Sequence, residues 1–341
     1  MNIFLTGANG FVGRELLQAL LRKGHRVHAL LRHPNQVPDT GDPNLVRFTG
    51  DITKPETLLP AMRGCEAVYH IAAFARMQAF DRSRFYKVNT EGTRHVLEAA
   101  ARSGVRKLVF TSTAGVMGPS LREPICESDP RITSFSNDYE LSKMLAEQLV
   151  TECASRRLFD TVIVSPSAVF GPGQETYSNA LTRFSRNFLR RGFAFVPMYQ
   201  QALANYTFIE DLVEGHQLAM EHGRSGEKYL LGGENLSLAS VLAGIRQAVG
   251  NKGIFIPLPR LLLQPAFSMI CQASALFRRD APVSPELLHK LYYNRCLCCE
   301  KAAAELGYRI TPFETAITKT IHHIKNDMYE KQELCPDNRC G

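Results

Sequence analysis

The sequence predicts an α/β fold, in which a doubly wound parallel sheet is followed by a smaller, mostly helical lobe. Over the first 170 residues, short apolar runs alternate with amphipathic stretches, which is the pattern of β-α-β units. A glycine-rich turn directly follows the first apolar run. After residue 172 helical segments dominate, with only short β pieces between them. A composition of 45% hydrophobic and 21% charged residues is that of a globular protein.

The elements of the sheet domain follow one another with short connections. We expect strands at 2–6, 26–31, 45–50, 67–71, 107–111 and 161–165, and helices at 11–23, from about 55, at 82–103 and at 137–157. Further short strands are expected near 206–208 and 228–230. These elements divide the chain into a sheet domain at 1–172, a substrate-binding lobe at 173–325 that is interleaved with the last sheet elements, and a polar, flexible tail at 326–341.

Charge and cysteine content exclude several classes of protein. The net charge is +7, but the basic residues are dispersed in short pairs such as Arg156-Arg157, which argues against nucleic-acid binding. The nine cysteines are an odd number, and no signal peptide is recognisable, so we expect free thiols and a cytoplasmic location. Cys296, Cys298 and Cys299 cluster, but their spacing matches no standard zinc pattern, and we expect no metal site.

The longest uncharged stretch runs from Leu261 to Phe277. It is short for a membrane span and contains Pro265 and several polar residues, so no span is expected. We expect a helix that packs over the substrate pocket. Weak interfacial attachment, which the following pair Arg278-Arg279 would suit, is the alternative.

The turn at residues 6–13 lies between the first strand and the first helix. Its glycines permit a tight turn and close approach of the backbone to a pyrophosphate, and the helix N-terminus offers free N–H groups. This strand–turn–helix context predicts a Rossmann-type dinucleotide site. The residues expected to contact the cofactor here are Gly7, Asn9, Gly10, Phe11, Val12 and Gly13.

The end of the second strand selects between the two nicotinamide cofactors. An acidic residue there would bind the ribose hydroxyls of NAD, whereas this chain has Arg32, which can pair with a 2′-phosphate. We therefore expect NADP, with NAD as the alternative. Asp51 and Ile52, just after the third strand, are expected to hold the adenine.

Tyr139 and Lys143 lie four residues apart, on one face of a predicted helix. A nearby ammonium favours the phenolate and is expected to lower the pKa of Tyr139, which would then exchange a proton with a carbonyl oxygen as hydride is transferred. Thr113, at the mouth of the fifth strand, is expected to orient the substrate oxygen. Ser112 is the competing candidate, and the sequence leaves the two open.

Together these motifs resemble the extended (atypical) short-chain dehydrogenases/reductases of the NAD-dependent epimerase/dehydratase superfamily. The resemblance covers nearly the whole chain. Besides the glycine turn and the Tyr139/Lys143 pair, the matching segments are 50–52, 70–73, 89–93, 166–172, 208–216 and 304–308.

The resemblance implies roles for individual residues. Lys143 would hold the nicotinamide ribose, Thr113 occupies the family's catalytic Ser/Thr position, and Asn89 has a structural or water-relay role. The implied cofactor contacts also include Ala72, Ala73, Pro166 and Val169.

Two branches of this superfamily compete. One resembles dihydroflavonol reductases and 3β-hydroxysteroid dehydrogenases, and the other comprises nucleotide-sugar epimerases and dehydratases. The latter usually carry a diphosphate-binding arginine near the position of Asn205, and no arginine lies between Arg191 and Arg224 here. We therefore expect an NADP(H)-dependent oxidoreductase acting on a carbonyl/alcohol pair of a small, apolar substrate. A nucleotide-sugar enzyme and a non-catalytic dinucleotide sensor are the alternatives, and a homodimer is left open.

Overall fold

The computed structural model describes residues 1–38, 41–76, 78–121, 123–277, 280–281, 288 and 290–334. Seven strands form one sheet in the order β10-β6-β5-β4-β1-β2-β3, and every neighbouring pair is parallel. They are β1 (Asn2–Thr6), β2 (Arg26–Leu31), β3 (Leu45–Thr49), β4 (Ala67–His70), β5 (Lys107–Thr111), β6 (Asp160–Pro166) and β10 (Lys228–Leu231). The predicted doubly wound sheet is confirmed.

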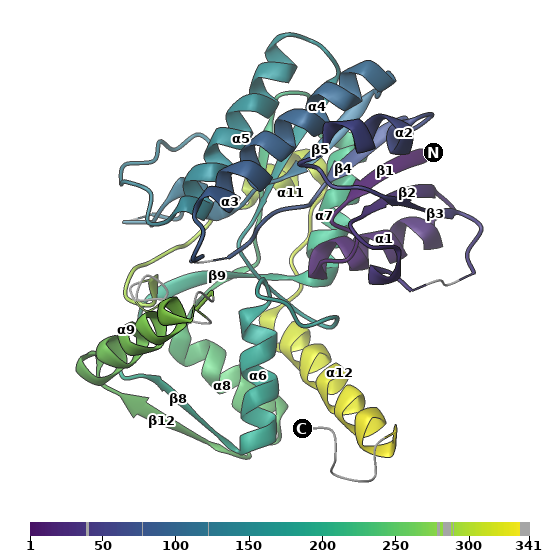
Figure 1. Cartoon of the computed structure of the whole chain (residues 1–341). Helices are drawn as coiled ribbons and strands as arrows, with labels where there is room; N and C mark the ends of the chain where they lie inside the picture. The colour runs from purple at the N-terminus through teal and green to yellow at the C-terminus, as the bar shows by residue number, and fades with distance from the viewer. Residues whose placement is uncertain are drawn as a thin grey trace.

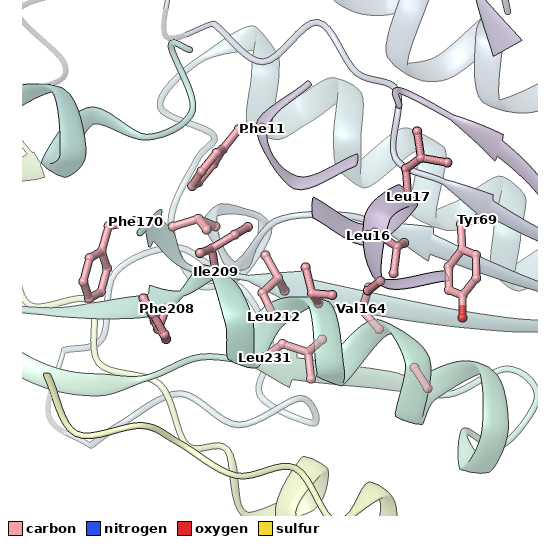
Figure 2. Packing of buried hydrophobic residues seen from close by; sticks show 14 of the residues in the cluster. Phe11, Leu16, Leu17, Tyr69, Val164, Phe170, Phe208, Ile209, Leu212 and Leu231 are labelled. Atoms are coloured by element: carbon pink, nitrogen blue, oxygen red, sulfur yellow. The ribbon is translucent and has the colours of Figure 1, made fainter. Parts of the chain in front are cut away.

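Helices cover both faces of this sheet (Figure 1). The alternation along β1 shows the two layers, because Ile3 and Leu5 join one hydrophobic core and Phe4 joins the other. The first core includes α1 (Phe11–Arg22) and α7 (Ile209–His222), and Figure 2 shows its packing. The second includes α2 (Leu58–Met62), α4 (Gly92–Ser103) and α5 (Asp138–Ser155).

The first core continues into the smaller lobe, where the rings of Phe170 and Phe313 lie 5.4 Å apart. The lobe contains a three-stranded sheet in the order β11-β9-β7 and a two-stranded parallel sheet of β12 and β8. Its strands are β7 (Ala168–Phe170), β8 (Phe193–Pro197), β9 (Leu203–Phe208), β11 (Glu234–Ser237) and β12 (Ile254–Leu258). Its helices are α6 (Ala180–Arg191), α8 (Leu238–Ala248), α9 (Arg260–Leu276) and α12 (Phe313–Leu334), whereas α11 (Glu300–Leu306) packs against α7 and β10 of the central sheet.

Two expectations need correction. The helix expected at 82–103 is divided into α3 (Ser83–Phe85), a π-helical stretch at Tyr86–Glu91, and α4. Helix α12 continues past residue 326 to Leu334, so the tail expected to be flexible from 326 is helical over its first part, and residues 335–341 lie outside the described residues.

Helix α9 is the helix expected to pack over the substrate pocket. The helix is present, but Leu263 is its only buried residue, so its apolar side chains do not form part of a core. Arg278 and Arg279, which follow it, lie outside the described residues. Among the helices described, none is long and apolar enough to cross a membrane.

Candidate active site

The turn between β1 and α1 has the geometry of a phosphate cradle. Gly7 has a φ of +79°, and its carbonyl oxygen accepts a 2.9 Å hydrogen bond from the Gly10 amide. A Cβ on Gly13 would lie 2.1 Å from that same oxygen, and one on Gly7 would lie 2.7 Å from the backbone nitrogen of Ala72. No side chain caps the N-terminus of α1. The residues therefore fit a pyrophosphate, because the turn is closed to side chains and the helix N-terminus leaves its N–H groups for a ligand.

The residues expected around the adenosine follow β2 and β3 at the carboxyl edge of the sheet. Arg32 comes directly after β2, and its side chain is exposed. Asp51 lies two residues beyond β3, where its Oδ1 accepts 2.9 Å hydrogen bonds from the amide and the hydroxyl of Thr53. Ile52 is buried, and a Cβ on Gly92 would meet its side chain at 2.8 Å. Asp51 is thus held by its own turn, while Arg32 is open to a solvent-borne ligand.

Helix α5 carries Tyr139 and Lys143. Its N-cap is Asn137, whose side-chain oxygen accepts a 2.9 Å hydrogen bond from the Glu140 amide and fixes where the helix begins. The Lys143 ammonium is buried, donates a 2.7 Å hydrogen bond to the Thr111 carbonyl oxygen, and lies 4.0 Å from the centroid of the Phe110 ring. Burial lowers the pKa of Lys143 to about 7.

The predicted lowering of the Tyr139 pKa is not what the structure shows. Burial, with a smaller effect from the neighbouring Glu140 carboxylate, raises the pKa of Tyr139 to about 12. The ammonium of Lys143 does not offset this, because it is directed to the Thr111 carbonyl and is itself only partly charged near pH 7. In this ligand-free state Tyr139 is therefore a protonated phenol throughout the neutral range.

Glu140, beside Tyr139, is the centre of a buried ion cluster that the sequence did not reveal. Its carboxylate lies 3.1 Å from Nη2 of Arg131 and 2.5 Å from Nζ of Lys290, and it accepts a 2.9 Å hydrogen bond from the Ser136 hydroxyl. The facing cations help to keep the pKa of Glu140 below its usual value. Lys290 comes from a segment 150 residues away, so no local pattern identifies this contact.

Both candidate hydroxyls lie at the end of β5. Thr113 is half-buried, and its Oγ1 accepts a 3.1 Å hydrogen bond from the Gly115 amide, which leaves its proton available to a ligand. The Oγ of Ser112 is buried and has no hydrogen-bond partner among the described residues. The geometry favours Thr113, because its hydroxyl is both oriented and accessible.

Asn89, on the π-helical stretch, is fully buried and joins the loop after β4 to α5. Its Oδ1 accepts a 2.7 Å hydrogen bond from the Phe74 amide, and its Nδ2 donates a 2.9 Å hydrogen bond to the Ser142 hydroxyl. Ser142 in turn donates to the carbonyl oxygen of Tyr139. Asn89 therefore positions both the segment that contains Ala72 and Ala73 and the helix that carries Tyr139.

A buried histidine links the glycine turn to the π-helical stretch. Because the Thr93 hydroxyl donates to the Asn89 carbonyl oxygen at 2.6 Å, it accepts from Nε2–H of His70 at 3.0 Å. Nδ1 of His70 then accepts from the Thr6 hydroxyl at 2.7 Å. Burial, together with the nearby Lys143, lowers the pKa of His70 to about 3, so this network is neutral. In the sequence His70 stands out only as part of the 70–73 segment, and the buried position of its side chain is what gives it this role.

At the end of β6, Pro166 is buried and Val169 lies on β7. Between them the Ser167 hydroxyl donates to Oδ1 of Asn205 at 2.7 Å. The Asn205 amide donates 2.7 Å and 2.8 Å hydrogen bonds to Gly233 O and Asn235 Oδ1. Asn205 is thus fully engaged in joining β7, β9 and β11.

The comparison with known proteins agrees with this geometry. The sequence profile of the NAD dependent epimerase/dehydratase family matches residues 3–232, most of the chain and every strand of the central sheet. The chain belongs to this family. It is accordingly an oxidoreductase of the short-chain dehydrogenase/reductase type, with a fold that binds NAD(P).

Two relatives and one structure illustrate the NAD-dependent epimerase/dehydratase family around this chain. A Synechocystis sp. protein that carries the name dihydroflavonol 4-reductase is 29% identical over 97% of this chain and 96% of its own length. A 3-beta-hydroxysteroid dehydrogenase of Mycolicibacterium neoaurum is 28% identical over 90% of this chain and 86% of its own. The UDP-glucose 4-epimerase of Thermus thermophilus, solved with NAD, shares the fold with a TM-score of 0.75 at 23% identity, covering 95% of this chain and 99% of that one.

Proposed function

We propose that this protein is an NADP(H)-dependent oxidoreductase that transfers hydride between the nicotinamide and a carbonyl/alcohol pair of a small, apolar substrate. The observation that carries the proposal is the pair of a half-buried Tyr139 and a buried Lys143 on α5, with the ammonium of Lys143 bonded to the last residue of β5. In parallel α/β sheets ligands bind outside the carboxyl ends of the strands, and this pair lies there.

The chemistry follows from the protonation states. The cofactor, when bound, supplies or accepts the hydride. Because the pKa of Tyr139 is raised to about 12, the phenol carries its proton at neutral pH and can donate it to a carbonyl oxygen in the reductive direction. Thr113 donates a hydrogen bond that orients the same oxygen. Lys143 binds the nicotinamide ribose hydroxyls. In the oxidative direction, the phenolate form of Tyr139 would accept the proton of the substrate alcohol. A charged Lys143 favours this phenolate form.

Arg32 supports NADP as the cofactor. It lies directly after β2 with an exposed guanidinium, which can bind a phosphate through two parallel hydrogen bonds. A carboxylate at this place would repel the 2′-phosphate instead.

The state of Asn205 supports the reductase branch over the nucleotide-sugar branch. Its amide is already used to join three strands, so it is not available to bind a diphosphate. One observation favours the second candidate, a nucleotide-sugar epimerase or dehydratase. Nε of Arg295 is buried and has no hydrogen-bond partner among the described residues, and such a group can receive an anionic ligand.

Substrate-dependent oxidation of NADPH distinguishes these functions. The purified protein is mixed with NADPH or NADH and a panel of ketones and aldehydes, including steroid ketones and dihydroflavonols. Calorimetry with UDP-glucose and dTDP-glucose runs in parallel. We expect turnover of an apolar carbonyl with NADPH and no binding of either nucleotide sugar. Micromolar affinity for a nucleotide sugar would establish the second candidate, and absence of any turnover with intact NADPH binding would indicate a dinucleotide sensor.

A further inference from the structure

Strands β8 and β12 and helix α9 lie at one end of the smaller lobe (Figure 1). Large apolar side chains of these three elements are exposed. We call this end of the lobe the apolar end and define it by six exposed residues of β8, β12 and α9, namely Phe193, Phe195, Ile254, Leu262, Met269 and Leu276. Isolated exposed apolar residues are normal on protein surfaces, but a group confined to three adjoining elements marks an interaction site.

The ribbon of β8 and β12 is apolar on both faces. Its inner face packs into the lobe, where the Phe255 ring stacks on Phe188 at 4.3 Å between centroids. On the other face Phe193 pairs with Ile254 and Phe195 pairs with Ile256, and all four side chains are exposed. A two-stranded ribbon that only closed the lobe would have polar residues on this outer face.

Helix α9 begins two residues after β12, and it too has exposed apolar side chains. Leu262, Met269 and Leu276 recur every seven residues along it, so they lie on one side of the helix. Met269 is 68% exposed and Leu276 is 80% exposed. Only Leu263 of this helix is buried, so α9 presents an exposed apolar face.

The charged residues in the two stretches that form the apolar end are all basic. The sequence contains no aspartate or glutamate from residue 176 to residue 209, or from residue 235 to residue 279. These two stretches supply α6, β8, α8, β12 and α9. They carry exposed basic residues throughout, which include Arg190, Arg191, Arg246, Lys252 and Arg260. These two stretches are therefore apolar, basic and free of carboxylates.

We propose that the apolar end docks on a membrane surface that contains anionic lipids. Apolar side chains would enter the boundary between headgroups and acyl chains, and the basic residues beside them would contact lipid phosphates. A second copy of the chain fits this surface less well, because a symmetric interface would bring the same basic residues together without a carboxylate of these two stretches to pair with them. This proposal does not depend on the proposed reaction.

Co-sedimentation of the purified full-length protein with vesicles tests the proposal. The vesicles consist of phosphatidylcholine alone or of phosphatidylcholine with roughly 30 mol% phosphatidylglycerol. Binding to each is measured at low and at high salt. We expect binding to the anionic vesicles only, and weaker binding at high salt. Equal binding to neutral vesicles, or no binding to either, would overturn it.

Two sets of variants locate the surface. The triple variant Leu262→Ser/Met269→Ser/Leu276→Ser removes the apolar face of α9, and we expect it to weaken vesicle binding at least about tenfold. Its matched control is Ile132→Ser/Leu158→Ser, which changes exposed apolar residues of the sheet domain. The charge variant Arg190→Glu/Arg191→Glu should weaken binding by about tenfold or more, whereas Arg63→Glu/Arg102→Glu, also exposed, should not.

Light scattering after gel filtration separates a membrane from a second copy. If the triple variant lowers the oligomeric state of the protein in solution, the apolar end is an interface between copies and the proposal fails. A thermal unfolding transition like that of the native protein shows, for each variant, that a loss of vesicle binding is not due to a loss of fold. If the triple variant does not fold, the charge pair and its control still decide the outcome.

Discussion

The ammonium of Lys143 is held by the backbone of Thr111, at 2.7 Å from its carbonyl oxygen. The hydroxyl of the same threonine bonds Nε2 of His216 at 2.8 Å, and Nδ1–H of His216 donates to the Leu212 carbonyl oxygen. One residue at the end of β5 thus fixes the lysine of α5 and a buried, neutral histidine of α7. The side chain of Lys143 is thus fixed in position, at the cost of burying its charge.

That burial predicts a pH-dependent stability. The pKa of Lys143 is lowered to about 7 from an ordinary value near 10.5, so between these pH values the unfolded chain binds more protons than the folded one. The destabilisation is complete below about pH 7 and disappears as the pH rises toward 10.5. Lys143→Met should therefore raise the melting temperature of the ligand-free protein at pH 6, and the gain should shrink between pH 7 and 10. Thermal unfolding across pH measures this, and a gain that does not change with pH would contradict the buried charge. Lys252→Met, at an exposed position, is the control.

Tyr139→Phe should abolish most of the activity while the fold and the affinity for NADPH are kept. The variant loses one hydroxyl and keeps the ring, so only the proton donor is removed, and we expect kcat/KM to fall by about 10²–10⁴-fold. The exposed Tyr329→Phe on α12 is the matched control. Steady-state kinetics and a separate NADPH titration provide the two readouts. Retention of most activity by a variant that still binds NADPH would remove Tyr139 from the mechanism.

Arg32→Asp should reverse the cofactor preference. The native protein should bind NADPH more tightly than NADH by about one to two orders of magnitude in Kd, as expected for a charge-assisted hydrogen bond to the 2′-phosphate. In the variant NADH should bind more tightly. Arg102→Asp, an exposed change at the end of α4, should leave the ratio unaltered. Fluorescence titration with both cofactors measures it, and a native preference for NADH would refute the role of Arg32.

Removal of the Thr113 hydroxyl should lower activity, whereas removal of the Ser112 hydroxyl should not. Thr113→Ala should reduce kcat/KM less than Tyr139→Phe does, since an orienting hydrogen bond is lost and not the proton itself, and Thr113→Ser should retain activity. Ser112→Ala should leave activity intact and increase stability slightly, because it removes a buried hydroxyl that has no partner among the described residues. Kinetics and melting temperatures of the three variants decide between them. A large activity loss in Ser112→Ala alone would transfer the role to Ser112.

Local sequence patterns were sufficient for the sheet and the glycine turn. The bounds of β1, β2 and β5 agree with prediction because each is an apolar run between clear turn or helix signals. Periodicity also located α9, but it does not report burial, and most of this apolar helix is exposed. The pKa of Tyr139 was expected to fall because sequence spacing gives the distance along the helix and not the direction of the Lys143 ammonium. The contact of Lys290 with Glu140 depends on the path of the whole chain and has no sequence signal.

The π-helical stretch at Tyr86–Glu91 makes the number of residues there as important as their identity. A π-helical turn contains an additional residue relative to an α-helical one. Deletion of a single residue would restore an α-helix and rotate the part before the deletion by about 100° relative to α4. If the deleted residue lies after Asn89, the side chain of Asn89 would face away from Phe74 and Ser142. The loop after β4 would then lose its hydrogen-bonded connection to α5. Most surface loops tolerate such changes in length, but here a change would separate the loop after β4 from α5, two segments that line the candidate active site.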